Sequence, residues 1–491
     1  MQAQNQRWMD NPVAFQQKIL QSIVQNAKNT AFGQDHHFDQ IRDYADFKRL
    51  VPVRDYEALR PYIDRIVAQG ESNVLWPGLP AYFAKTSGTT SGTKYIPLTR
   101  DSVPNHINSA RNALLAYIYA TRKSDFLDRN LIFLSGSPVL TQTGPANILT
   151  GRLSGMVNHH VPAYLRTNQK PSFETNCIED WEEKLEKIID ETLSADMSLI
   201  SGIPPWVQMY FDRIQARTGK TIKEVFPNFS LFVYGGVNFE PYRKKLFDSI
   251  GQAVDSIETY PASEGFIAYQ DSQVEPGLLL LANSGIFFEF IPAEDYFKEN
   301  PPRYHIGEVE LNKNYALVLS SNAGLWSYSI GDTVKFISNR PYRLLVTGRI
   351  KHFISAFGEH VIGEEVEKAM QKTLAQYPAV SISEFTVAPQ VNPSEGLPHH
   401  EWLIAFERLP QNLPAFAQTL DQHLCQLNTY YDDLITGKIL RPLRITVLRP
   451  DAFQQYMKSI GKLGGQNKVP RLANDRSLAD AMREEWKQNT A

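Results

Sequence analysis

Short apolar runs that alternate with longer helical patterns constrain the fold of this chain more than any other feature. Residues 131–134, 198–200 and 231–234 are each a brief apolar run of the kind that forms a buried strand. Between the first two runs, residues 181–192 place apolar side chains on one face of a helix. This alternation is typical of an α/β body with a largely parallel sheet.

A second stretch, from residue 277 to about residue 346, has a different texture. Strand-like runs follow one another there without helical patterns between them. Strands joined by short connections pair antiparallel, because a parallel pair needs a long crossover. We therefore expect a mostly antiparallel, β-rich subdomain, with strands at residues 278–281, 286–291, 308–311, 316–319 and 333–337.

The segments on either side of this stretch complete an α/β fold class. Amphipathic patterns predict helices at residues 13–24 and 56–68. We expect a large N-terminal domain, residues 1–345, with mixed parallel sheets plus the β-rich subdomain, and a small C-terminal α/β domain, residues 346–491. In the smaller domain, helices are expected at residues 362–374 and 412–427 and strands at residues 385–387 and 402–406.

Charge and cysteine content exclude several classes of protein. The 491 residues carry a formal net charge of −3, without the basic face typical of nucleic-acid-binding proteins. The two cysteines, Cys177 and Cys425, are too few for a disulfide framework or a zinc site. The most apolar stretch, residues 277–291, is too short and too polar to cross a bilayer. We expect a soluble cytoplasmic protein with neither nucleic acid nor membrane as a partner.

The strongest local motif is the hydroxyl-rich run TSGTTSGTK at residues 86–94, which follows the apolar run 81–84. Glycines let a backbone approach a ligand closely, and converging N–H and hydroxyl groups suit phosphate oxygens. It is not a Walker A loop, because three residues separate its glycines and Thr93 precedes Lys94. The alternative is a flexible linker loop.

Two acidic turns follow strand-like segments. Glu264, in the turn after residues 254–257, could hold a Mg²⁺ ion that bridges phosphates, with Tyr260 against a flat base. Asp332 could accept hydrogen bonds from ribose hydroxyls. The alternatives are a Pro/Gly turn and an ordinary Gly-Asp turn.

Cations cluster at two later places. Arg349 and Lys351 lie near the expected domain boundary, and Lys468 lies in a basic tail segment. A lysine on its flexible stem is a suitable mobile phosphate contact. The alternatives are a solvated strand edge and a basic tail.

Two pairs of adjacent histidines, His159-His160 and His399-His400, could suggest metal ligands. Neighbouring side chains point in different directions, and no further ligand follows at zinc-like spacing. Both pairs are expected at the surface or in loops.

The order of these motifs resembles the adenylate-forming superfamily. More specifically, the chain resembles a bacterial member of the Gretchen Hagen (auxin-responsive) acyl-acid amido synthetase family, over about residues 51–471. The motifs that carry this resemblance are the segments at residues 51–57, 61–63, 94–99, 260–264 and 468–471.

The resemblance implies ATP and Mg²⁺ as cofactors, and a mobile C-terminal lid. Lys468 and Glu264 would be catalytic, with Glu264 next to Mg²⁺ and Lys468 on the lid. Plant members often carry a lysine in the segment that matches residues 358–361; the nearest candidate in this chain is His360, so that phosphate contact is left open. The ATP-binding residues would be Thr86, Ser87, Gly88, Thr89, Thr90, Tyr260, Ser263, Asp332 and Arg349.

The expected reaction is adenylation of a carboxylic acid, then transfer of the acyl group to an amine, for which an amino acid is expected, with release of AMP and pyrophosphate. The acid would lie near Arg111, Tyr234, Gly235 and Gly236, although for Arg111 the pattern favours the alternative of a surface helix residue. Thioester formation with coenzyme A and a non-catalytic nucleotide-binding protein are the alternatives. A monomer or weak dimer is expected.

Overall fold

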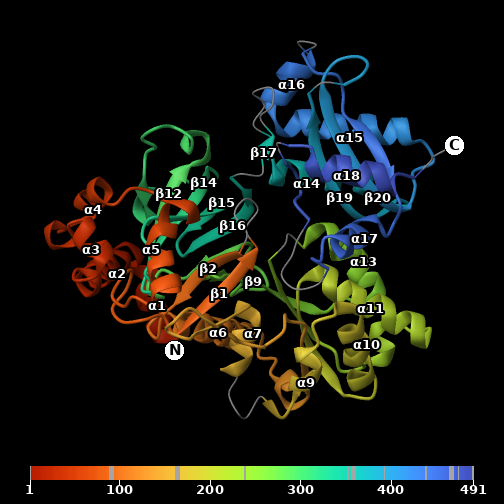
Figure 1. The fold of residues 1–491 in the computed structure, drawn as a ribbon. Coiled ribbons are helices and arrows are strands. Elements are labelled where there is room, and N and C mark those ends of the chain that lie inside the picture. The colour runs from red at the N-terminus through yellow and green to blue at the C-terminus, as the bar shows by residue number, and fades with distance from the viewer. Residues whose placement is uncertain are drawn as a thin grey trace. The chain divides into compact units, whose positions relative to one another are not determined.

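The chain folds into two compact units, Met1–Phe239 with Leu246–Val346, and Glu240–Lys245 with Thr347–Ala491. Figure 1 shows the ribbon coloured along the sequence. This computed structural model describes residues 2–87, 93–160, 166–236, 239–350, 353–354, 361–391, 393–436, 439–463, 469–473 and 475–488.

A twelve-stranded sheet organises unit 1, the larger of the two units. Its β9-β8-β7-β3-β6 part is parallel, and the part from β9 to β13 is antiparallel wherever a register is described. This confirms the α/β class with a β-rich second part. In spatial order the strands are β13 (Tyr304–His305), β12 (Ile286–Pro292), β14 (Asn314–Ser321), β15 (Tyr328–Asn339), β16 (Tyr342–Arg349), β11 (Leu278–Leu280), β10 (Gly265–Tyr269), β9 (Asp255–Ala262), β8 (Leu231–Gly235), β7 (Met197–Ser201), β3 (Asn130–Phe133) and β6 (Gln169–Lys170).

One expected strand of the β-rich part is wrong. Glu308 ends the short 3-10 helix η4 (Ile306–Glu308), and the residues after it form only an isolated bridge, between Leu311 and Phe336. The Glu308 carboxylate accepts a hydrogen bond from the His305 N–H at 2.8 Å, closing a capping box. Local capping therefore prevails over the apolar alternation of this segment.

A smaller four-stranded sheet in unit 1 carries the hydroxyl-rich motif. Its order is β2-β1-β5-β4, with β1 (Tyr82–Ser87) and β2 (Thr93–Leu98) as an antiparallel hairpin. The remaining strands are β4 (Thr141–Thr143) and β5 (Ile148–Gly151). The motif thus spans the connection between two paired strands.

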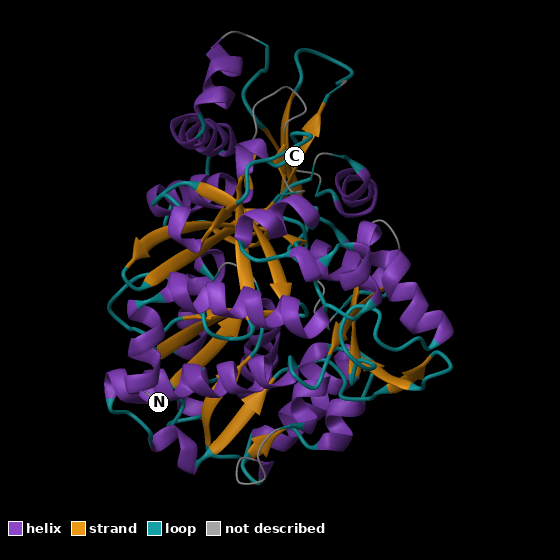
Figure 2. Cartoon of the chain, turned by 90° about the vertical axis from the view of Figure 1, so that its left-hand side faces the viewer, coloured by secondary structure: helices purple, strands orange, loops and turns teal. Residues whose placement is uncertain are grey.

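Helices surround the strands of unit 1, and polar caps set where several of them begin. The Asp55 side chain accepts a hydrogen bond of 3.2 Å from an N–H in the first turn of α5 (Tyr56–Gln69). The Asp180 side chain caps α10 (Trp181–Thr192) in the same way, at 2.8 Å. In Figure 2, helices in purple flank strands in orange. The helices are α1 (Gln2–Asp10), α2 (Pro12–Ala27), α3 (Ala31–Asp35), η1 (Phe38–Gln40), α4 (Tyr44–Leu50), α5 (Tyr56–Gln69), α6 (Val103–Thr121), η2 (Asp125–Asp128), α7 (Leu153–His159), α9 (Phe173–Cys177), α10 (Trp181–Thr192), α11 (Pro204–Thr218), α12 (Ile222–Val225) and η3 (Ala293–Asp295), while α13 (Glu240–Ile250) spans a unit boundary.

Unit 2 is built on the three-stranded sheet β19-β20-β21. Along β20 (His399–Arg408), Trp402 and Ile404 pack into one core cluster, whereas Leu403 and Ala405 pack into another. Since alternate residues of a strand point to opposite faces, both faces of this strand are covered. The other strands are β19 (Ser381–Gln390) and β21 (Arg444–Leu448), with the separate pair β17 (Phe353–Ile354) and β18 (Val361–Ile362).

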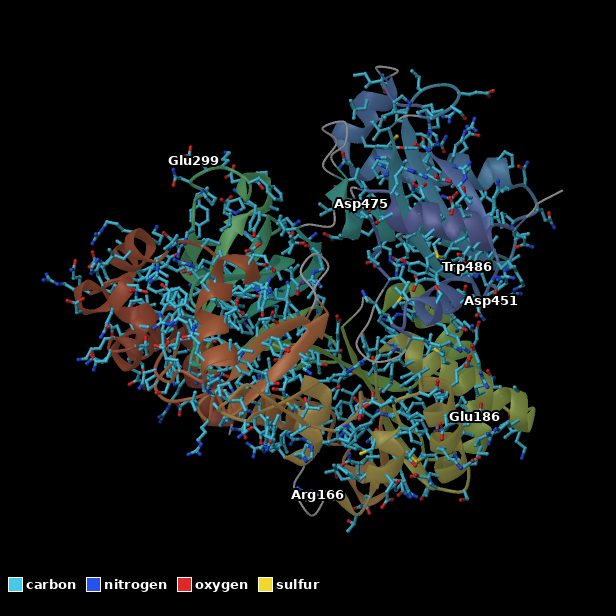
Figure 3. All side chains as sticks on the ribbon, in the orientation of Figure 1. Arg166, Glu186, Glu299, Asp451, Asp475 and Trp486 are labelled. Carbon is cyan, nitrogen blue, oxygen red and sulfur yellow. The ribbon has the colours of Figure 1, made fainter. Side chains whose placement is uncertain are left out.

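The helices of unit 2 divide between these two clusters. Residues of α14 (Gly363–Gln376) and α15 (Leu413–Leu427) belong to the first cluster, and residues of α17 (Ala452–Ser459) and α18 (Ser477–Trp486) belong to the second. The Trp486 carbonyl accepts a hydrogen bond from Arg449 N–H at 3.2 Å, so α18 ends beside the start of α17, where Figure 3 labels Asp451 and Trp486. A short helix, α16 (Thr429–Thr436), follows α15.

The expectation that His399 and His400 lie at the surface or in a loop is wrong. Both are in β20, with 5% and 0% of their surface exposed. The His400 ring lies 4.9 Å from the Tyr431 ring. Both faces of β20 are covered, so successive side chains along it are buried, and these two histidines are among them.

No helix within the described ranges is both long enough and apolar enough to pass through a bilayer.

Candidate functional site

The Tyr260–Gly265 motif forms the tip of a β-hairpin. Strand β9 continues through Tyr260 to Ala262, and Ala262 pairs with Gly265 at the start of β10. The connection is therefore only two residues long, Ser263 and Glu264. Ser263 is buried, whereas Glu264 is partly exposed at the tip. A loop this short holds the position of its side chains closely.

Tyr260 and Asp332 are brought together although they lie 72 residues apart in the sequence. The Tyr260 hydroxyl donates a hydrogen bond of 2.7 Å to Asp332 Oδ2. Their strands, β9 and β15, are separated in the sheet by β10, β11 and β16. A flat sheet would hold them about 19 Å apart at about 4.8 Å per strand, beyond the reach of these side chains. The sheet therefore curls strongly between β9 and β15, so that the two motifs share one location.

Tyr234 and Gly235, at the carboxyl end of β8, adjoin the same hairpin. The Tyr234 carbonyl accepts a hydrogen bond of 2.9 Å from Thr259 Oγ1, next to Tyr260. A Cβ atom on Gly235 would lie 2.4 Å from the Thr259 carbonyl oxygen, so only glycine allows this approach. Gly236 is exposed and has a φ of +86°. Carboxyl ends of parallel strands are the usual place for ligands in α/β sheets.

The hydroxyl-rich motif is described only at its two strand ends. Thr86 and Ser87 end β1, and the register pairs Ser87 with Thr93 across the hairpin. Gly88, Thr89 and Thr90, proposed as phosphate contacts, lie outside the described residues, as does the Ser87 side chain. Whether this motif meets Glu264 and Asp332 stays a prediction.

Helix α6, a helix expected from the sequence near the acid pocket, supplies two residues whose contacts the motifs did not indicate. The Asn105 side chain is hydrogen-bonded to both backbone groups of Phe266, two residues beyond Glu264. The next residue, His106, is buried, and its Nδ1 atom has no hydrogen-bond partner in the described part of the chain. Burial lowers the pKa of His106 to about 4, so its ring is neutral near pH 7. No local pattern marks the contact of Asn105, because its partner Phe266 lies 161 residues away in the sequence.

Arg111, also on α6, is exposed. An exposed helix position agrees better with the alternative of a surface residue than with a buried carboxylate partner. Its predicted role in binding the acid stays a prediction.

Two predicted cations belong to unit 2. Arg349 is exposed at the end of β16, and Lys468 lies just outside the described segment 469–473. That segment runs alongside β19: Val387 N–H donates to the Arg471 carbonyl and Ala473 N–H donates to the Val387 carbonyl, both at 3.0 Å. The chain that follows Lys468 is thus anchored to the sheet of unit 2. His360 is also outside the described residues.

The carboxylates of Glu264 and Asp332 in unit 1 are suited to bind ATP together with Mg²⁺. Among the described residues, no three or more His, Cys, Asp or Glu side chains gather to hold a metal. A Mg²⁺ ion that accompanies ATP needs only one or two carboxylates, since phosphates and waters supply its other ligands. Glu264 at the hairpin tip and Asp332 beside Tyr260 therefore have suitable chemistry for metal and ribose hydroxyls.

The fold is that of adenylate-forming enzymes. The structure matches a solved GH3.15 acyl acid amido synthetase with a TM-score of 0.81 at 17% identity, over 99% of this chain and 96% of the other. It matches a 2-hydroxyisobutyryl-CoA ligase with a TM-score of 0.66 at 11% identity, over 97% and 92% of the two chains. Family models for the GH3 N-terminal, central and C-terminal domains match residues 2–144, 279–349 and 364–477. The chain belongs to the GH3 family.

Characterised relatives are similar at low identity. A jasmonoyl–L-amino acid synthetase, GH3.5 of Oryza sativa subsp. japonica, is 24% identical over 94% of this chain and 92% of its own length. A jasmonoyl–L-amino acid synthetase of Nicotiana attenuata, JAR4, is 25% identical, and the match spans 65% of this chain and 66% of the relative, just under two thirds.

Proposed function

We propose that this protein adenylates a carboxylic acid with ATP and then transfers the acyl group to an amine. The amine that we propose is the amino group of an amino acid. The observation that carries the proposal is the 2.7 Å hydrogen bond between Tyr260 and Asp332, which unites two separate motifs next to the Glu264 turn. Membership of the GH3 family supports the same reaction.

The chemistry asks the protein to bring two anions together. The substrate carboxylate attacks the α-phosphorus of ATP, so positioning and charge neutralisation supply most of the catalysis. Asp332 would accept hydrogen bonds from the ribose, Tyr260 would lie against adenine, and Thr86–Thr90, Ser263 and Arg349 would contribute further nucleotide contacts. Mg²⁺, held by Glu264, would offset negative charge on the phosphates.

Lys468 would approach the phosphates from unit 2, which we propose acts as a mobile lid, residues 346–491. The segment after Lys468 supports this role, because residues 471–473 are hydrogen-bonded to β19 within the proposed lid. The amine would then attack the acyl-adenylate.

The relatives act on jasmonate or indole-3-acetate by name, so a hydrophobic or planar acid is the first class to try. Tyr234, Gly235 and Gly236 are the proposed acid contacts. We also propose a cytoplasmic protein of bacterial origin that works as a monomer or weak dimer, on the resemblance of its motifs alone.

The test is acid-dependent exchange of labelled pyrophosphate into ATP across a panel of carboxylic acids, with and without Mg²⁺. Exchange with one class of acid, lost in Lys468→Ala, is the expected result. If the folded protein exchanges no pyrophosphate into ATP with any acid of the panel, the proposal is contradicted.

Thioester formation is the second candidate, because the fold also resembles that of a CoA ligase. Once an acid is found, amino acids and coenzyme A are supplied separately. Amide product with amino acids alone supports the first proposal, and thioester product supports the second.

A further inference from the structure

The Asn105 side chain clamps the strand that carries the Glu264 turn. Its Nδ2 donates to the Phe266 carbonyl at 3.1 Å, and its Oδ1 accepts from Phe266 N–H at 2.7 Å. Asn105 is only 9% exposed, so both bonds are shielded from water. The N–H and C=O of Phe266 therefore both bond to one side-chain amide, in place of the backbone groups that a neighbouring strand would offer.

The clamp lies beside an irregular part of the hairpin. The residue opposite Phe266 in the register is Pro261. The register also shifts between Phe266 and Ala268, which marks an irregularity in the pairing. Without Asn105, the backbone of Phe266 would be buried with fewer partners, two residues from Glu264.

Helix α6 is anchored to the same hairpin a second time, at the far end. The Tyr117 hydroxyl donates to Asp255 Oδ2 at 2.7 Å, at the start of β9. Asp255 also accepts from Lys123 at 2.5 Å, so it keeps a partner if Tyr117 loses its hydroxyl. The helix thus has one anchor beside the Glu264 turn and one remote from it.

We infer that Asn105 is a positioning residue that sets the place of Glu264 for Mg²⁺. The inference rests on the proposed function, because it takes Glu264 as the residue that meets the metal. Asn105 itself touches neither metal nor nucleotide in this assignment; it acts through Phe266 and the two-residue turn. Outer partners of this kind typically change metal affinity or activity by about 10-fold to 100-fold when removed.

The experiment measures binding of α,β-methylene ATP by calorimetry at a series of Mg²⁺ concentrations, with no acid present. In Asn105→Ala, the Mg²⁺ concentration for half-maximal binding should rise about 10-fold, as it should in Glu264→Gln. Tyr117→Phe is the matched control, since it removes the other anchor of the same helix, and its Mg²⁺ requirement should stay within about 2-fold of wild type.

Hydrogen exchange supplies a readout without ligand: Asn105→Ala should exchange faster at Phe266 and its neighbours, and Tyr117→Phe should not. If Asn105→Ala does not fold, Asn105→Asp carries the test, because it keeps the volume and the acceptor but loses the donor. An unchanged Mg²⁺ requirement in the Asn105 variant, or an equal rise in Tyr117→Phe, overturns the inference. Because no acid is needed, this result is separate from a failure of the pyrophosphate exchange, which would overturn the proposed function.

Discussion

At the scale of residues, a single hydrogen bond links the two acidic motifs of the proposed nucleotide site. Tyr260 donates to a carboxylate, and hydrogen bonds to charged groups are worth more than neutral ones. The bond also orients Asp332. Loss of the bond should therefore disturb the proposed binding of the ribose by Asp332 as well as the position of the Tyr260 ring.

Tyr260→Phe should raise the KM for ATP roughly 10-fold, because a bond to a charged group contributes about 1.5–3 kcal/mol. Steady-state kinetics with a saturating acid measure the change. Tyr62→Phe is the control, since Tyr62 makes a similar 2.8 Å hydrogen bond to Asp35 elsewhere in unit 1. Equal effects of the two substitutions would contradict a specific role for Tyr260.

His106 makes a separate prediction about pH. Burial lowers its pKa in the folded chain to about 4 from a usual value of 6.5, so the unfolded chain binds the extra proton between these values. Stability should be fully present above about pH 6.5 and fall as the pH drops toward 4. Between pH 7 and pH 5 this group should account for about 2 kcal/mol.

Urea unfolding of wild type and His106→Leu at both pH values tests this point. The wild type should lose more stability than the variant between pH 7 and pH 5. Parallel losses would show that His106 is not responsible.

The scale of elements shows what the sequence could predict and what it could not. The strands at residues 131–134, 198–200 and 231–234 were predicted because they are apolar and short, and β3, β7 and β8 confirm them. The strand predicted at residues 308–311 was wrong, because a capping box outweighed the apolar pattern. The clamp by Asn105 could not be predicted, since its two ends are 161 residues apart and no local pattern encodes the pairing.

The candidate site was predictable only in part for the same reason. Motif order suggested that Tyr260 and Asp332 belong together, but the curl that joins β9 to β15 is a property of the whole sheet. The roles of Ser87, Glu264 and Lys468 stay predictions.

A buried ion pair ties the N-terminal helices to β12. Arg303 Nη2 lies 2.5 Å from Glu289 Oε1, and Arg303 Nη1 donates to the Val51 carbonyl at 2.7 Å. The Tyr44 hydroxyl on α4 donates to the same carboxylate at 3.1 Å. In Figure 1 the red α4 and the green β12 belong to segments far apart in sequence.

Arg303→Met should destabilise unit 1 by about 3–5 kcal/mol, because removing one partner leaves the Glu289 charge buried without its cation. Urea denaturation measures the loss. The exposed pair Arg49–Asp46 is the control, and Arg49→Met should change stability far less. A small effect of Arg303→Met would show that water or nearby groups compensate for the lost cation.

At the scale of the whole molecule, the two units have separate hydrophobic cores. The cluster that includes Phe290 and Trp326 lies in unit 1, and the clusters of β20 lie in unit 2. In unit 2, Arg471 is paired with Glu384 at 2.5 Å and with Glu367 at 3.1 Å, and it should stabilise that unit as Arg303 stabilises unit 1.

Scanning calorimetry should therefore resolve two unfolding transitions, because separate cores need not melt together. Arg303→Met should lower one transition temperature and Arg471→Met the other. A single transition that both variants lower equally would contradict independent units.

The curl between β9 and β15 has a consequence for shortened relatives. The central family domain, residues 279–349, contributes Asp332, whereas Tyr260 precedes that domain. A natural or engineered form that lost residues 279–349 could retain its parallel strands. It would nevertheless lack Asp332, the carboxylate proposed to bind the ribose of ATP. The proposed recognition of the nucleoside would therefore require both the strand that carries Tyr260 and the strand of the central domain that carries Asp332.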